Sequence, residues 1–165
     1  MYKAVIKNDK YYMLPKQNGY ATFKDSLPST SGAIPAPSIT ATSGWTNPKN
    51  AFDGSQDTYA SCGTATDYIQ LTYSTPVIIT GITGYGNYKS KVSRAMNLRL
   101  YSVVNGTETL LCTTSGCTNS TAYTTSGTCT ATTASIFRIR LSEKNQEGHT
   151  PATTYPSRMK EIILS

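Results

Sequence analysis

The chain has little of what catalytic sites usually need. Its 165 residues include one histidine, so a Ser/His/Asp or Cys/His arrangement has only His149 to draw on. The four cysteines contain no C-x-x-C pair, and with a single histidine they match no zinc signature. The sequence therefore argues against nucleophilic catalysis of these types and against a sulfur-ligated metal.

Long apolar runs are also missing. No stretch approaches the length needed to cross a membrane, and residues 1–8 lack the apolar region of a signal peptide. We therefore expect a soluble protein with no membrane insertion and no visible export signal. Runs of helix-forming residues are few, whereas abundant Thr and Ser, twelve Tyr, twelve Gly and eight Pro favour short strands joined by turns. The composition predicts an all-β protein.

The net charge of +6 is concentrated at the beginning of the chain. Residues 1–24 hold five lysines against Asp9 alone, which gives +4 there and +2 over the remainder. Nucleic-acid binding usually needs a dense Arg/Lys surface with interleaved aromatic residues. The remainder instead has scattered charges, so we predict no nucleic-acid partner.

The chain divides into three parts. Residues 1–24 predict a β-hairpin with strands at 2–6 and 10–14, which we interpret as an attachment arm. A lone two-stranded hairpin is marginal in water, so the arm packs on the body or docks on a partner. Residues 25–37, rich in Pro and Ser, predict an extended linker. Residues 38–165 form the main domain.

Strand signals recur at short intervals in the main domain, with no helical period between them. In one of them Met96, Leu98 and Leu100 alternate with outward Arg99 and Tyr101. The predicted strands are 39–43, 68–73, 76–82, 96–103, 136–141 and 159–164. This spacing favours an antiparallel β-sandwich.

Two features of the main domain leave alternatives open. Residues 112–135 are nearly all Thr and Ser, which is compatible with disorder or with a polar surface hairpin. The cysteines could form two disulfides, with Cys112–Cys117 closing a small loop and Cys62–Cys129 as the second pair, or could remain buried free thiols.

The stretch from Asn50 to Tyr59 carries the clearest chemical pattern. Asp53-Gly54 predicts a tight turn with the glycine at positive φ, while the two preceding apolar residues, Ala51 and Phe52, face inward. Four oxygen-bearing side chains follow at 55–58. Oxygens that converge on one centre suit Ca²⁺, although an ordinary turn between strands gives the same pattern.

Taken together, several motifs in order resemble the coagulation factor 5/8 type C (discoidin) domain and its carbohydrate-binding relatives in the galactose-binding-like superfamily. The motifs are the segments 39–45, 50–54 with 58–59, 68–71, 82–86, 98–101, 137–140 and 159–162. The resemblance covers residues 38–165. It implies a jelly-roll β-sandwich, a structural Ca²⁺ in the loop after the first strand, and a ligand site in loops at one end.

The resemblance also assigns metal ligands by position. It implies that Asp53 binds Ca²⁺ through its side chain, Thr58 through its hydroxyl or carbonyl, and Glu161 through a carboxylate that returns from the last strand. Asn50 and Ser55 would add backbone carbonyls. Two carboxylates with neutral oxygens match the ligand set that Ca²⁺ prefers. Ser55 departs from the Asn or Asp usual in the family.

Sugars are typically held by an aromatic face and a few fixed polar groups. The candidate ligand-binding residues are Trp45, Tyr85, Asn87, Tyr88, Arg94, His149 and Tyr155. Core packing is the alternative for Trp45, and a plain surface position is the alternative for His149. We expect Gly86 to let Tyr85 and Tyr88 project from a tight turn.

These observations predict a non-catalytic module that binds carbohydrate on a cell surface. We expect residues 1–37 to attach it to other virion proteins of a phage, made in the host cytoplasm and present in many copies or as a homo-oligomer. An extracellular or cell-surface location is the alternative place. The competing functions are a purely structural virion protein, and a glycosidase that uses Asp53 and Glu161 as its paired carboxylates.

Overall fold

The computed structural model describes residues 36–87, 95–117, 122–145 and 148–165 with their side chains. Before them it gives the backbone of four short strands, β1 (Tyr2–Lys7), β2 (Lys10–Pro15), β3 (Pro28–Ser29) and β4 (Gly32–Ala33). β1 and β2 pair antiparallel, as the pattern in residues 1–24 predicts. The division into arm, linker and main domain stays a prediction. In the part of the chain that is described, no helix has the length and apolar character to cross a membrane.

Over its described residues, the main domain consists of eight strands and one short helix. They are β5 (Ser38–Ala41), β6 (Trp45–Thr46), the 3-10 helix η1 (Pro48–Phe52), β7 (Ala60–Cys62), β8 (Tyr68–Gly86), β9 (Leu98–Val104), β10 (Thr107–Thr113), β11 (Tyr123–Leu141) and β12 (Ser157–Leu164). The strands pair in the order β10-β9-β11-β8-β12-β7-β6, and β5 pairs with β8. All of these pairs are antiparallel.

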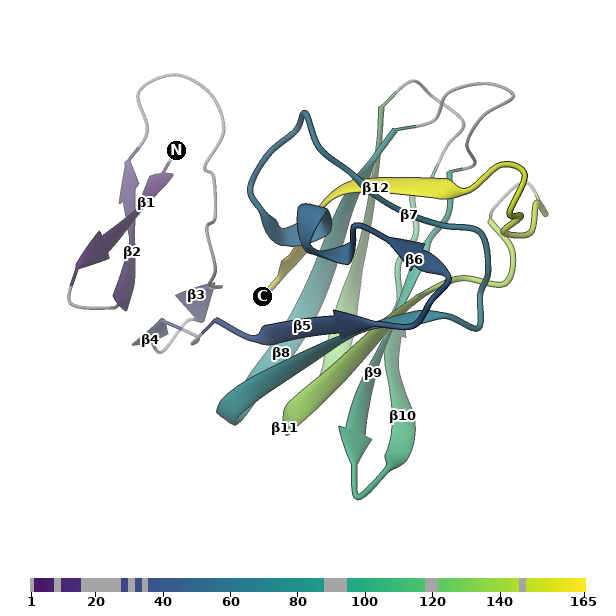
Figure 1. The fold of residues 1–165 in the computed structure, drawn as a ribbon. Helices are drawn as coiled ribbons and strands as arrows, with labels where there is room; N and C mark the ends of the chain where they lie inside the picture. Colours follow the sequence, from purple (N-terminus) through teal and green to yellow (C-terminus); the bar gives the residue numbers. More distant parts are fainter. Residues whose placement is uncertain are drawn as a thin grey trace.

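Two long strands carry this continuous sheet from one layer of a sandwich into the other. Residues 68–72 of β8 lie between β5 and the end of β11, whereas residues 82–86 lie between β12 and the start of β11. One layer therefore contains β5, β9 and β10, and the other contains β12, β7 and β6 (Figure 1). The predicted antiparallel β-sandwich is confirmed.

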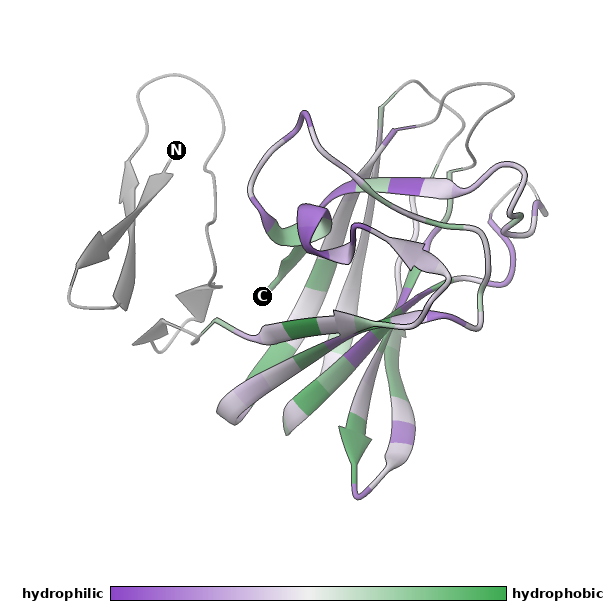
Figure 2. Ribbon diagram, viewed as in Figure 1, coloured by the Kyte–Doolittle hydropathy of each residue, from purple (hydrophilic) through white to green (hydrophobic). Residues whose placement is uncertain are grey.

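The core lies between these layers, where alternate residues of each strand point inward. Leu98 and Leu100 of β9, and Phe137 and Ile139 of β11, are completely buried. Figure 2 shows the resulting apolar bands along the strands. Full burial of each such side chain stabilises the fold by about 1.5–3 kcal/mol, so the period-2 pattern is the main determinant of this architecture.

The sequence predicts separate strands at 68–73 and 76–82, but the structure has one strand that bends. Val77 pairs with Ala134 and Thr72 pairs with Ile136, so β8 has extra residues at the bend. These residues, Ser74 to Pro76, are exposed. Because they lie on the outside of the corner, they interrupt the apolar pattern without ending the strand.

Most of the Thr/Ser-rich stretch forms β11, which is a central strand, so disorder is excluded for the described residues 112–117 and 122–135. Ser115 and Ser126 form an antiparallel bridge, but the stretch is part of the main sheet and not only a surface hairpin. The side chain of Thr125 is fully buried, and its hydroxyl lies 2.9 Å from Asn97 Oδ1. The Leu98 N–H donates to Thr114 Oγ1 at 2.7 Å. Threonine can face the interior here because hydrogen bonds satisfy its hydroxyl.

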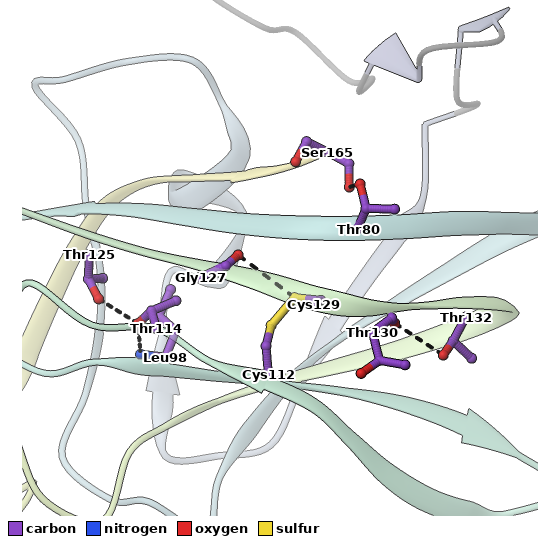
Figure 3. Close-up of a disulfide and its surroundings, with 10 residues drawn as sticks. All are labelled: Thr80, Leu98, Cys112, Thr114, Thr125, Gly127, Cys129, Thr130, Thr132 and Ser165. Atoms are coloured by element: carbon purple, nitrogen blue, oxygen red, sulfur yellow. Dashed lines mark hydrogen bonds between the residues drawn. A yellow bond between two sulfur atoms is a disulfide. The ribbon is translucent and has the colours of Figure 1, made fainter.

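The disulfide links a pair that the sequence analysis did not propose. Cys112 of β10 is bonded to Cys129 of β11 (Figure 3). Cys62 and Cys117 are buried and are not part of a disulfide. The proposed pairs Cys112–Cys117 and Cys62–Cys129 are therefore both wrong. Proximity in sequence is a poor guide here, because antiparallel packing brings residues 17 positions apart to a Cα separation of 4.7 Å.

Candidate functional site

The loop after η1 is organised by Asp53. Its Oδ1 accepts a hydrogen bond of 2.8 Å from the Ser55 N–H, and its Oδ2 accepts one of 2.7 Å from the Thr58 hydroxyl. Gly54 has a φ of 71°, as the Asp-Gly pattern predicts. Ala51 is fully buried and Phe52 packs against the core, so both face inward as expected. One carboxylate thus closes the turn after η1, and the buried Ala51 anchors that helix to the core.

Glu161 of β12 belongs to the same region. Its side chain is 5% exposed, and its Oε2 is buried with no hydrogen-bond partner. Burial, and secondarily the negative charge of Asp53, raise the pKa of the Glu161 carboxyl from 4.5 to about 8, against the effect of a hydrogen bond from the Gly54 backbone. The two carboxylates predicted as metal ligands therefore interact electrostatically.

This arrangement fits a divalent cation. An orphaned carboxylate oxygen that faces a second carboxylate costs free energy unless a proton or a cation compensates it. Within the described residues no group of three or more His, Cys, Asp or Glu could hold a metal, so the remaining ligands would be neutral oxygens. Calcium accepts such a mixed set of carboxylate and carbonyl oxygens.

The predicted neutral ligands lie around the same loop, and their side chains already have partners. The Asn50 Nδ2 donates to the Tyr59 carbonyl at 3.3 Å, and the Ser55 hydroxyl accepts the Asp57 N–H at 3.1 Å. The Thr58 hydroxyl is bonded to Asp53. Their backbone carbonyls are thus better candidates for metal ligation than their side chains.

Trp45 is not an exposed platform. It is 6% exposed, belongs to the core and lies opposite Cys62 where β6 pairs with β7. The expectation that it presents a ring to a ligand is therefore wrong, and its alternative, core packing, describes the residue. A single large aromatic in a short amphipathic strand gives no sequence signal that separates these roles.

Three of the predicted ligand residues occur at one end of the sandwich. Tyr85 is half-buried near the end of β8, and the Asn87 N–H donates to the Arg158 carbonyl of β12 at 3.1 Å. Tyr155, also half-buried, comes two residues before β12 begins. The end of β8 and the start of β12 are therefore neighbours, although they are about 70 residues apart in sequence.

The other predicted ligand residues are less well defined. His149 is exposed. Its N–H donates to Asn145 Oδ1 at 2.9 Å, and its carbonyl accepts the Asn145 N–H at 2.9 Å. Tyr88 and Arg94 lie outside the described residues. Gly86 is the last residue of β8 and its φ is not positive, so it does not supply the turn conformation that the sequence predicts for it. A Cβ at Gly86 would collide with the ring of Tyr123, which explains the glycine.

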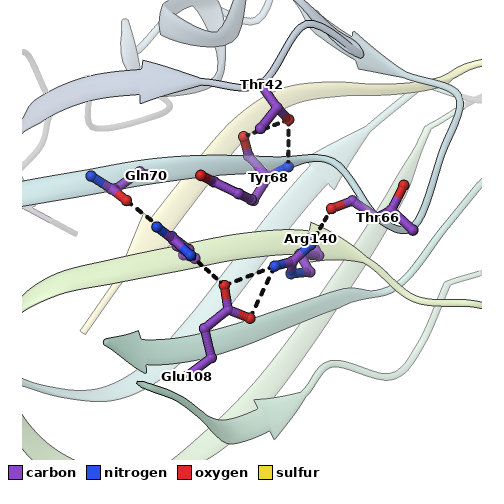
Figure 4. A network of polar contacts seen from close by, with 7 residues as sticks. Thr42, Thr66, Tyr68, Gln70, Glu108 and Arg140 are labelled. Atoms are coloured by element: carbon purple, nitrogen blue, oxygen red, sulfur yellow. Dashed lines mark hydrogen bonds and ion pairs between the residues drawn. The ribbon is translucent and has the colours of Figure 1, made fainter. Parts of the chain in front are cut away.

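The outer face of the other layer carries a polar network that sequence reasoning missed. Glu108 of β10 accepts a 2.6 Å hydrogen bond from Arg138 and two, of 2.8 and 2.9 Å, from Arg140 (Figure 4). Arg138 also stacks on Tyr68, with 4.1 Å between the guanidinium carbon and the ring centroid. Both arginines come from β11 and reach across β9, so they tie the edge strand β10 to the sheet. The positive charges of Arg138 and Arg140 are therefore paired with Glu108 inside the protein.

Another arginine–tyrosine contact occurs beside the predicted sugar site. The guanidinium carbon of Arg158 lies 4.5 Å from the centroid of the Tyr59 ring. Sequence reasoning also missed Arg158, because its partner is about 100 residues away and on a different strand. Regular alternation in 157–160 indicates an outward side chain but not what it meets.

Comparisons with known proteins give the same fold. No protein-family model matches the chain, and no curated protein sequence matches it. Among solved structures, the family 32 carbohydrate-binding module (CBM32) of AlyQ in complex with 4,5-unsaturated mannuronic acid has a TM-score of 0.55 at 20% identity, covering 85% of this chain and 97% of that one. The family 32 module of C. perfringens NanJ in complex with galactose has a TM-score of 0.54 at 14% identity, covering 76% and 92%.

A third structure extends this group. Chitosan-binding module 1 from the chitosanase/glucanase of Paenibacillus sp. IK-5 has a TM-score of 0.50 at 19% identity, covering 78% of this chain and 94% of that module. The structural neighbours are thus carbohydrate-binding modules of the galactose-binding-like type. At these identities the likeness establishes the fold.

Proposed function

We propose that the protein is a non-catalytic carbohydrate-binding module whose sugar site lies where β8 ends and β12 begins. The observation that carries the proposal is the hydrogen bond from the Asn87 N–H to the Arg158 carbonyl, which puts Tyr85, Asn87 and the approach to β12 at one end of the sandwich. The shared fold with carbohydrate-binding modules supports the same function.

The residues at this end have the chemistry that sugar binding needs. The half-buried rings of Tyr85 and Tyr155 can pack against the C–H groups of a sugar ring. The amide of Asn87 can hydrogen-bond to sugar hydroxyls and fix its orientation. Because backbone hydrogen bonds hold both strands, these groups are positioned before a ligand arrives.

A structural Ca²⁺ completes the proposal. Asp53 and Glu161 would hold it with their carboxylates, with backbone carbonyls such as those of Asn50 and Ser55 as neutral ligands. The buried Glu161 Oε2 without a partner supports this site. The ion would neutralise the two carboxylates and fasten β12 to the loop after η1. Since Glu161 pairs with Tyr85 across β12 and β8, the same ion would stiffen the strand that carries the sugar-binding tyrosine.

The setting of the module remains a proposal that rests on composition. The basic arm and the Pro/Ser-rich linker in residues 1–37 would attach it to a larger assembly, such as a phage virion that contacts the host envelope. Single modules bind sugars modestly, so many copies would supply the avidity. Copurification of the protein with purified virions would support this setting, and its absence from them would count against it.

The function can be tested with the full chain on a glycan array, with and without a Ca²⁺ chelator. We expect specific binding that Tyr85→Ala abolishes. Tyr101→Ala is the matched control, because it removes a half-buried tyrosine from the outer face of the other layer. No binding by a folded protein, or equal loss in both variants, would contradict the proposed site.

A further inference from the structure

The stack of Arg158 on Tyr59 is held by the sheet itself. Tyr59 immediately precedes β7, and Arg158 pairs with Ser61 where β7 meets β12. The Tyr59 carbonyl also accepts a hydrogen bond from the Asn50 side chain at 3.3 Å. The tyrosine ring and the guanidinium, 4.5 Å from each other, are therefore fixed by paired strands rather than by mobile side chains alone.

The guanidinium of Arg158 has no anionic partner in the described part of the chain. The ion pairs found there involve the side chains of Arg99, Arg138 and Arg140. The Arg158 Nε is buried, so only the terminal nitrogens of the guanidinium can meet a ligand from solvent. A tyrosine face compensates a cation only partly. Because Arg158 takes part in none of these ion pairs, its charge suits an external anion, whereas Arg138 and Arg140 share Glu108.

This cation borders the proposed sugar site. The Asn87 N–H donates to the backbone carbonyl of Arg158, so the two positions are adjacent. Tyr59 is 39% exposed, which leaves part of its ring available to a ligand. A second cationic residue, Lys160, lies two positions after Arg158 on β12. Aromatic surface and positive charge therefore lie next to each other at this end.

We propose that the bound glycan is acidic and that Arg158 binds the carboxylate or sulfate group of one of its sugars. This inference rests on the proposed sugar-binding function. The planar guanidinium offers two parallel N–H donors, which match the paired oxygens of a carboxylate or sulfate. The sugar ring that carries the anion packs beside the exposed part of Tyr59. Because the stack already orients the guanidinium, little side-chain entropy is lost on binding.

Calorimetric titration of the full chain with three oligosaccharides tests the inference. A polyuronate oligosaccharide, a sulfated glycosaminoglycan oligosaccharide and a neutral galacto-oligosaccharide separate carboxylate, sulfate and uncharged ligands. We expect an acidic ligand to bind more tightly than the neutral one, with an affinity that falls as salt is added. Arg158→Ala should lower the affinity for the acidic ligand by about tenfold or more, since it removes a charge-assisted hydrogen bond.

Matched variants show whether the stack acts as described. Lys144→Ala removes one positive charge from an exposed residue after β11 and should leave affinity unchanged. Tyr59→Phe keeps the ring and should retain binding, whereas Tyr59→Ala should weaken it. Arg158→Gln is the fallback if Arg158→Ala does not fold, and thermal unfolding of each variant checks its folding.

The outcomes separate the inference from the function on which it rests. Neutral and acidic ligands that bind equally, with no effect of Arg158→Ala, would overturn the acidic specificity and leave the carbohydrate-binding function standing. Binding to none of the three oligosaccharides and to no glycan on the array would overturn both. If only the polyuronate binds selectively, the group that Arg158 binds is a carboxylate. If only the sulfated ligand does, that group is a sulfate.

Discussion

The buried carboxyl of Glu161 makes the stability of the metal-free protein depend on pH. In the unfolded chain this group loses its proton near pH 4.5, whereas in the folded chain it keeps the proton until about pH 8. Between these values the folded state binds the extra proton, so the free energy of unfolding falls as pH rises, by about 1.4 kcal/mol per unit. Over the whole interval, the free energy of unfolding can fall by at most about 5 kcal/mol. The actual loss is smaller if the loop at 53–59 opens and lets water reach the carboxylate.

The assay is urea unfolding of the full chain between pH 5 and pH 8, in chelator and in excess Ca²⁺. In chelator the protein should lose stability toward pH 8. In Ca²⁺ it should be stabilised there, because an ion that binds only the folded state shifts the equilibrium by RT ln(1 + [Ca²⁺]/Kd). A stability in chelator that does not fall with pH would refute the reasoning about the buried carboxyl, and no effect of Ca²⁺ at pH 8 would refute the metal site.

Two substitutions sharpen this test. Glu161→Gln should remove both the pH dependence and the response to Ca²⁺, and in chelator at pH 8 it should be more stable than the wild type. Glu143→Gln changes a carboxylate whose side chain is 77% exposed, and should behave like the wild type. If Asp53 and Glu161 were instead glycosidase carboxylates, Glu161→Gln would abolish turnover without changing the thermal stability of the protein.

Other parts of the structure give further predictions. Replacing both Cys112 and Cys129 with serine removes their disulfide and should lower the free energy of unfolding by about 3 kcal/mol, because the bond joins residues 17 positions apart in sequence. Denaturant unfolding measures this loss. Glu108→Gln should destabilise the protein by about 1 kcal/mol at pH 7. Burial would raise the pKa of Glu108, but its two arginine partners outweigh this and lower it, so the difference from wild type should fade as pH falls below 4.5. Gly86→Ala should cost about 1–3 kcal/mol, because its Cβ overlaps the buried ring of Tyr123; a melting temperature equal to wild type would contradict that packing.

The architecture could be predicted from the sequence because burial follows a period of two. Met96, Leu98 and Leu100 alternate with Arg99 and Tyr101, and the structure buries the first three and leaves the other two half-buried. Local turn chemistry was equally informative at Gly54, whose positive φ the Asp-Gly pair predicts.

What the sequence could not give are contacts between distant strands. Thr125 sits in a central strand because Asn97 and Thr114 satisfy its hydroxyl, and no local pattern encodes those partners. The same holds for the partner of Cys112 and for the stack of Arg158 on Tyr59. Each depends on which residues the sandwich brings into register.

For the candidate site, the sequence predicted which carboxylates and which tyrosines to consider, but not their surroundings. Asp53 and Glu161 were found by position, yet the unsatisfied oxygen of Glu161 is visible only once η1 and its loop are folded. Trp45 was misassigned as a possible platform because an aromatic residue in a two-residue strand can face either way.

Chemical-shift mapping of backbone amides by NMR, as the full chain is titrated with an oligosaccharide selected on the glycan array, locates the sugar site residue by residue. We expect shifts at Tyr85 and Asn87 and through residues 148–158, where β8 ends and β12 begins. Shifts confined to the face that carries Tyr68 and Tyr101, or no shifts at saturating ligand, would contradict the proposed site.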